Sequence, residues 1–199
     1  MPIITAEEAA QYLNIQADTA GFKEQVASAC KRAEVFCRRV FDLQESITEY
    51  HDIYAGQCVI WVKHPPIVTL TSVTDDANTT IITSRSNRAI TVTSNVELYP
   101  DGGPHLYLKL VNNESVFVPG SKTAKVVYTG GYAGEDMPGD LKQAVKMLVA
   151  YWWEGPEAFT RKQQAVDGQA ITWAEPDSEA PDMPKPVANI LRGYRLVVF

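Results

Sequence analysis

The sequence predicts an α+β fold, because two kinds of pattern occupy different parts of the chain. Both ends carry apolar residues at helical steps of three and four. The middle, from Leu43 to Tyr128, has short alternating runs rich in Val, Ile, Thr and Tyr, separated by Asp, Asn, Gly and Pro. We expect a small helical bundle of two long helices and a short N-terminal helix, with an inserted antiparallel β section.

The N-terminal segment predicts a short helix. Thr5-Ala6-Glu7-Glu8 fits a capping box, in which the Thr hydroxyl and the Glu8 carboxylate each satisfy an amide of the first turn. The pattern ends near Asn14.

An apolar stripe from Phe22 to Phe41 predicts the first long helix. Cys30 and Cys37 lie on this stripe about 10 Å apart, too far for a disulfide between them, so we expect two small core residues. With Cys58 they make three cysteines, an odd number typical of reduced thiols in a cytosolic setting.

The opposite face of this helix is basic and leaves two interpretations open. It is either a solvated face or a surface for phosphate or an acidic partner. Its residues are Lys31, Arg32, Arg38 and Arg39.

The β-rich section predicts seven strands joined by tight turns at Asp75-Asp76-Ala77-Asn78 and Asp101-Gly102-Gly103. The predicted strands are Ile47 to Ile53, Cys58 to Val62, Ile67 to Val73, Thr80 to Thr83, Ala89 to Thr93, His105 to Leu110 and Ala124 to Tyr128.

Pro138 begins the second long helix, which Gly155-Pro156 ends. Its apolar face holds Leu141, Ala144, Val145, Leu148, Val149 and Trp152. Three consecutive rings, Tyr151, Trp152 and Trp153, must point in different directions, so we expect at least one of them to contact another segment or subunit.

The C-terminal part reads as a linker followed by a short helix. Residues Gln163 to Pro186 lose periodicity and are rich in Pro and acidic residues, which is typical of a mobile linker. A helix is expected over Val187 to Tyr194. The predicted organisation is therefore a helical bundle over 1–42 and 136–162, a β section over 43–135, and a linker with a terminal segment over 163–199.

The charge distribution argues against a general nucleic-acid binder. The formal net charge is −6, whereas phosphate affinity comes mainly from Lys and Arg. The stretch from Glu135 to Asp182 is the acidic part of the chain. Hydropathy predicts no membrane contact, since no apolar run approaches the ~20 residues of a spanning helix.

No catalytic, metal-binding or cofactor-binding motif stands out. Folding could bring His51, Asp52 and a distant His together, but satisfied histidines are the commoner outcome. Gly130-Gly131-Tyr132-Ala133-Gly134 resembles a phosphate loop only until Glu135 and Asp136, which would repel a phosphate, so a structural turn is expected. We predict no enzyme, no metal and no cofactor.

One alternative from another class remains. An intracellular enzyme or ligand-binding domain would use a pocket at the junction of sheet and helices. Its polar groups would be His51, His64 or His105 and the pair Glu135 and Asp136.

A whole-chain pattern carries a resemblance to a known family. Its elements, in order, are Ile4 to Ala9, Tyr12-Leu13, Pro65-Pro66-Ile67, Val126 to Tyr132, Met137 to Ala144, and Tyr194-Arg195 before an apolar end. The chain resembles the head-tail connector (adaptor, or head-completion) proteins of tailed bacteriophages and prophages, in the larger variety with a β-rich insertion. It departs from them where Tyr151 to Pro156 precedes Arg161-Lys162.

The resemblance implies a structural protein of the virion neck, present in the host cytoplasm during assembly. Such a protein forms a ring, commonly of twelve copies, beneath the portal protein, extends the DNA channel without sequence-specific binding of double-stranded DNA, and meets a stopper or tail-completion protein. Another neck part, such as a stopper or tail-completion protein, remains an alternative.

Candidate sites follow from that role. The C-terminal segment would act as a docking tail, with Leu191, Arg192, Tyr194, Arg195 and Phe199 as portal-docking candidates. Subunit-interface candidates are Tyr151, Trp152, Trp153, Arg38 and Arg39. Channel-facing candidates are Glu135, Asp136 and Asp140, although the acidic stretch could equally keep a linker solvated.

Overall fold

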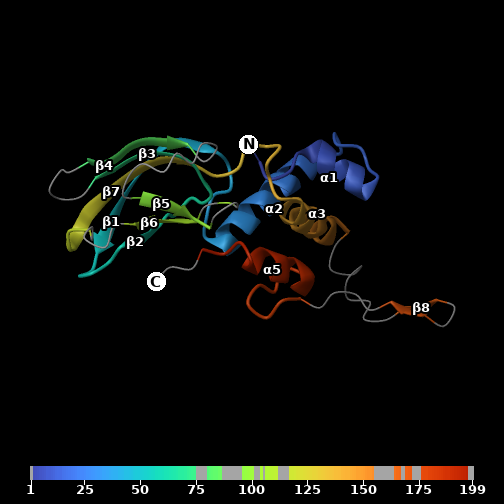
Figure 1. Cartoon of the computed structure of the whole chain (residues 1–199). Coiled ribbons are helices and arrows are strands. Elements are labelled where there is room, and N and C mark those ends of the chain that lie inside the picture. Colours follow the sequence, from blue (N-terminus) through green and yellow to red (C-terminus); the bar gives the residue numbers. More distant parts are fainter. Residues whose placement is uncertain are drawn as a thin grey trace. The chain divides into compact units, whose positions relative to one another are not determined.

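The computed structural model contains both helices and antiparallel sheets, which confirms the mixed α+β class (Figure 1). It describes residues 2–74, 80–86, 96–100, 104, 106–111, 117–154, 164–166, 169–171 and 176–196. The chain forms two compact units. The helical unit comprises residues 1–39 and 134–199, and the β unit comprises residues 40–133.

The helical unit begins with α1 (Ala6–Leu13), and the predicted capping box is present. The Thr5 amide donates to the Glu8 carboxylate at 2.9 Å, and the Glu8 amide donates to the Thr5 hydroxyl at 3.2 Å. Asn14 closes the helix in the left-handed conformation, at the position expected from the sequence.

Helix α2 (Phe22–Cys37) is shorter than its apolar stripe suggested. Arg38 takes a left-handed conformation and its amide bonds back to the last turn, which ends the helix. The predicted extension to Phe41 is therefore wrong, because Val40 and Phe41 belong to the β unit. Cys30 and Cys37 are free and buried, as predicted.

Helix α3 (Gly139–Glu154) packs against both α2 and α5 (Lys185–Arg192). Its predicted apolar face is completely buried from Leu141 to Val149 and partly buried at Trp152. Trp153 meets Phe22 of α2 edge to face at 5.0 Å between ring centroids. Helix α5 starts two residues earlier than predicted, with Pro186 in its first turn. Within the described part of the chain, no helix has the length and apolarity needed to cross a membrane.

A short antiparallel pair, β8 (Gln164–Val166) with β9 (Gln169–Ile171), lies where the sequence predicted an aperiodic linker. Each strand has three residues, too few to show a period in the sequence.

The β unit contains two antiparallel sheets. The larger has the order β1-β7-β3-β4 and the smaller has the order β2-β6-β5. The strands are β1 (Gln44–Ile53), β2 (Val59–Trp61), β3 (Ile67–Thr74), β4 (Thr80–Ser86), β5 (Val96–Tyr99), β6 (Tyr107–Leu110) and β7 (Gly120–Gly130). Six of the seven predicted strands match these, whereas β5 was not predicted. The predicted strand over 89–93 and both predicted turns lie outside the described residues.

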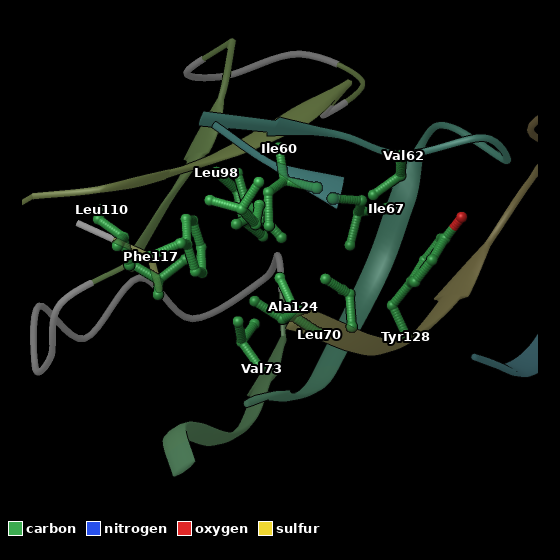
Figure 2. Packing of buried hydrophobic residues seen from close by; sticks show 14 residues of the cluster. Ile60, Val62, Ile67, Leu70, Val73, Leu98, Leu110, Phe117, Ala124 and Tyr128 are labelled. Atoms are coloured by element: carbon green, nitrogen blue, oxygen red, sulfur yellow. The ribbon is translucent and has the colours of Figure 1, made fainter. Parts of the chain in front are cut away.

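The core of the β unit lies between its two sheets (Figure 2). Ile60 and Leu98 of the smaller sheet and Leu70, Val73 and Ala124 of the larger are all at most 6% exposed. Because side chains alternate along a strand, this inward-facing set fixes which face of each sheet is buried.

The chain enters the β unit just before β1 and leaves it just after β7, and these two segments lie side by side. We call them, residues 41–43 and 130–132, the root. The Leu43 amide donates to the Tyr132 carbonyl at 3.0 Å, and the Tyr132 amide donates to the Phe41 carbonyl at 2.9 Å. Gly131 has φ +101°, and a Cβ there would lie 2.3 Å from the Asp42 carbonyl oxygen. The glycine run is thus a close backbone contact rather than a phosphate loop.

We predict that Gly131→Ala lowers the free energy of unfolding by about 2 kcal/mol or more, because both the positive φ and the Asp42 carbonyl oppose a side chain. Urea unfolding followed by circular dichroism measures this. Gly139→Ala is the matched control, since a Cβ there meets nothing within 4 Å. Equal unfolding midpoints for Gly131→Ala and the wild type would contradict the close-contact explanation.

Candidate functional site

A buried carboxylate organises the most polar site inside the β unit. Glu49 of β1 is 6% exposed. The Tyr128 hydroxyl donates to it at 2.5 Å, the Lys63 amide lies 3.1 Å from both carboxylate oxygens, and His64 Nδ1 lies 3.3 Å away. His51 Nε2 lies 3.1 Å from Oε2, without the geometry of a hydrogen bond. We call these five residues the Glu49 cluster.

The cluster keeps a charge inside the protein. Burial alone would raise the pKa of Glu49, but the donors and the two imidazoles around it hold that pKa well below its ordinary value. The cluster joins β1, β7 and the segment before β3 through one ionised group. Its chemistry is that of a structural cross-link, since the described groups around the carboxylate are a backbone amide, a Tyr hydroxyl and two imidazoles of the protein itself.

From the sequence, His51, Asp52 and a distant histidine could come together, and only part of this group does so in the structure. His51 and His64 meet at Glu49, but Asp52 instead accepts from the Ser121 hydroxyl at 2.8 Å and the Lys122 amide at 2.7 Å. His105 lies outside the described residues. In the described ranges, no group of three or more His, Cys, Asp or Glu residues is arranged to hold a metal ion. Glu49 was not predicted as a site residue. The one feature of the sequence that indicates it is a charged residue at a position of β1 where the strand's alternation predicts a buried side chain.

The second polar site holds residues 176–196, which we call the C-terminal brace, against the other helices of its unit. Arg32 of α2 makes two bonds to the Asp182 carboxylate, at 2.6 and 2.8 Å. Trp152 Nε1 donates to the Asp182 carbonyl at 2.8 Å. Within the brace, Arg192 binds both oxygens of Asp177 at 2.7 and 2.8 Å, which holds the pKa of that carboxyl below its usual range.

The predicted portal-docking residues lie in this brace, except Phe199, which is outside the described residues. Leu191 is fully buried, and its carbonyl accepts from the Cys37 thiol at 3.4 Å. Burial raises the pKa of that thiol to about 12, so it stays protonated and able to donate. Tyr194 donates to Asp140, and Arg195 pairs with Glu179 at 3.3 Å. Arg192, Tyr194 and Arg195 are each partly exposed.

The predicted subunit-interface residues divide between internal contacts and the surface. Trp152 and Trp153 contact the brace and Phe22 as described above, and Tyr151 is partly buried. Arg38 is exposed, whereas Arg39 is 8% exposed. Trp152 therefore meets another segment of the same chain, which is one of the two outcomes the sequence predicted.

The predicted channel-facing residues precede and begin α3. Glu135, Asp136 and Asp140 are all exposed. Asp140 accepts from Tyr194 and also from its neighbouring Leu141 amide at 2.9 Å, which fits a carboxylate near a helix N-terminus.

Comparison with known proteins decides the family. A family model described as head completion protein matches residues 2–197 of this chain. The chain belongs to the head completion protein family. The resemblance to head-completion proteins drawn from the sequence is confirmed. No curated protein sequence matches the chain.

Solved structures share the fold over nearly the whole chain. A chain from the neck of an empty gene transfer agent (GTA) particle, computed with C6 symmetry, has a TM-score of 0.56 at 17% identity and covers 99% of this chain and 91% of its own. A chain from the virion of a native GTA particle has a TM-score of 0.53 at 18% identity, with coverage of 99% and 91%. A chain from the neck of a native GTA particle, computed with C12 symmetry, has a TM-score of 0.53 at 16% identity, with coverage of 98% and 91%.

We predict that Glu49→Gln destabilises the protein by about 2 to 4 kcal/mol at pH 7, because it replaces a buried ionised acceptor that has several donors. The folded pKa of Glu49 lies below that of the unfolded chain, so this contribution is present above about pH 4.3 and is lost as the pH falls further. Urea unfolding at pH 7, 5 and 3.5 tests both points.

Glu45→Gln is the control on the same strand, since Glu45 is exposed. The two variants should differ strongly at pH 7 and progressively less below pH 4. A Glu49→Gln protein as stable as Glu45→Gln at pH 7 would show that the cluster does not stabilise the fold.

We also predict that Asp177→Ala loosens the brace, because it removes both bonds that Arg192 makes to this carboxylate and the acceptor of the Glu179 amide. Hydrogen exchange of residues 176–196, measured by mass spectrometry, should become several-fold faster while that of β1 and β7 is unchanged. Asp136→Ala, at an exposed carboxylate, is the control. Unchanged exchange in the brace would mean that its apolar contacts alone hold it.

Proposed function

We propose that this head completion protein acts as a ring of identical copies that docks onto the portal protein and extends the DNA channel toward the next neck component. The observation that carries the proposal is the family match over residues 2–197. Because a heterologous contact that closes on itself generates a ring, a connector on a symmetric vertex needs one such contact per copy.

The similar solved structures support an oligomer. Two of them are neck structures computed with C6 and C12 symmetry, and the chain covers almost all of each. We propose twelve copies for this chain, with the portal above the ring and a stopper or tail-completion protein below it. The role is structural and involves no catalysis.

The portal contact is proposed for the exposed parts of the brace and the chain end. Arg192, Tyr194 and Arg195 present partly exposed side chains of the types that dominate interface energies, and Phe199 would add an apolar anchor. Leu191 contributes indirectly, since its burial fixes the helix that carries them. Arg38 is a candidate for the contact between copies because it is exposed.

The channel or rim is proposed for the acidic residues before α3. Glu135 and Asp136 are exposed carboxylates, and Asp140 is partly engaged by Tyr194. A DNA conduit should repel phosphate weakly rather than bind it, because each Lys or Arg contact adds an attraction that slows passage.

The experiment is the native mass of the purified protein, alone and with its portal, by light scattering with negative-stain images of the same fractions. We expect a complex of one portal with one closed ring, whatever the state of the free protein. A protein that forms no ring alone and does not bind the portal would overturn the proposal.

A further inference from the structure

The exposed apolar surface of the described residues gathers on the β unit. The described part of the chain has seven exposed large hydrophobic side chains, and five of them belong to the β unit. They are Tyr50, Tyr54, Trp61, Val68 and Val111, whereas the helical unit contributes Tyr12 and Val35. Single exposed hydrophobic residues are normal, so the informative feature is a group of them in direct contact.

One such group lies on the outer face of the smaller sheet. Trp61, Tyr107 and Tyr99 are paired directly across strands β2, β6 and β5. Their rings contact in sequence, with centroids 4.5 Å apart for Trp61 and Tyr107 and 5.3 Å apart for Tyr107 and Tyr99. Trp61 is 47% exposed. We call these three residues the aromatic ladder.

Two charged residues of the described part of the chain, Glu97 and Lys109, lie beside the ladder, and the sheet itself engages both. Glu97 lies directly opposite Lys109 on the neighbouring strand and accepts from the Tyr99 hydroxyl. The Lys109 ammonium lies 6.0 Å from the centre of the Tyr99 ring. Among the described residues, the charges beside the rings therefore balance, which favours an uncharged protein surface over DNA phosphate as the partner of this face.

The ladder is held in place before any partner arrives. Each ring packs against the next, so little side-chain freedom remains to be lost on binding. Trp and Tyr are also the residues that most often dominate interface energies. These properties are those of a contact surface rather than of a solvated face.

The size of the face indicates the kind of partner. Three strands about 4.8 Å apart and up to four residues long span roughly 14 by 13 Å, or about 200 Å². A stable binary interface buries about 800 Å² on each partner. The ladder is therefore too small to hold a separate protein by itself. It is large enough as a second contact, when another contact already holds the neighbour nearby and raises its effective concentration.

We propose that the aromatic ladder contacts a neighbouring copy of this chain in the assembled ring. This inference rests on the proposed function, because a ring holds each copy between two identical neighbours and so supplies the second contact. The ladder is then a ring-closing surface, and it does not dimerise the free protein.

The test compares Trp61→Glu with Val68→Glu for assembly on the portal. Both residues are exposed, but only Trp61 belongs to the ladder. Mass photometry and negative-stain images should show closed rings for the wild type and for Val68→Glu, and at least about tenfold fewer for Trp61→Glu. Trp61→Ser serves as a second variant, and urea unfolding confirms that each variant is folded.

Each other outcome has a distinct meaning. Normal rings from a folded Trp61→Glu and Trp61→Ser would overturn the inference and leave the proposed function intact. Normal rings that fail to recruit the next neck component would also overturn it, since the ladder would then bind that component. A wild type that neither forms rings nor binds the portal would overturn the proposed function itself.

Discussion

The β unit depends on one constraint, the close approach of its entering and leaving strands at the root. Backbone hydrogen bonds join Leu43 and Tyr132 and then Tyr132 and Phe41, and no side chain fits at Gly131 because the Asp42 carbonyl occupies that space. Each such bond stabilises the fold by only about 1 kcal/mol. Their importance is geometric, because they close the 94-residue β unit, residues 40–133, as an insertion with its own core.

Two charged sites then stabilise the two units separately. In the β unit, the Glu49 carboxylate joins β1, β7 and the segment before β3. In the helical unit, the pair Arg32–Asp182 fixes the brace to α2, and the pair Arg192–Asp177 ties α5, whose apolar face is buried, to the segment before it. In both cases the apolar contacts provide the bulk of the burial, and the charged groups select a single arrangement.

The sequence predicted the class, the helices and most of the strands, because these follow from local periodicity. It also predicted the capping box at Thr5 and the structural role of Gly130-Gly131. It could not place the end of α2, since the apolar stripe continues through Phe41 after the backbone has turned at Arg38. Strand β5 was missed because four residues carry too little pattern.

The candidate sites were harder to predict because they depend on contacts between distant residues. Glu49 and His64 are 15 positions apart, and Arg32 and Asp182 are 150 apart, so neither pairing has a sequence signature. The same reason explains the brace, whose Pro-rich and acidic composition reads as a linker although its described part is held by ion pairs. The family, in contrast, was visible in the order and spacing of short motifs.

The most direct test of the connector role is an electron cryo-microscopy reconstruction of the protein bound to its portal. We expect a closed ring of copies on the portal axis, each traced with its root intact. A reconstruction with one isolated copy, or with the protein bound to the outside of the portal away from the axis, would contradict it.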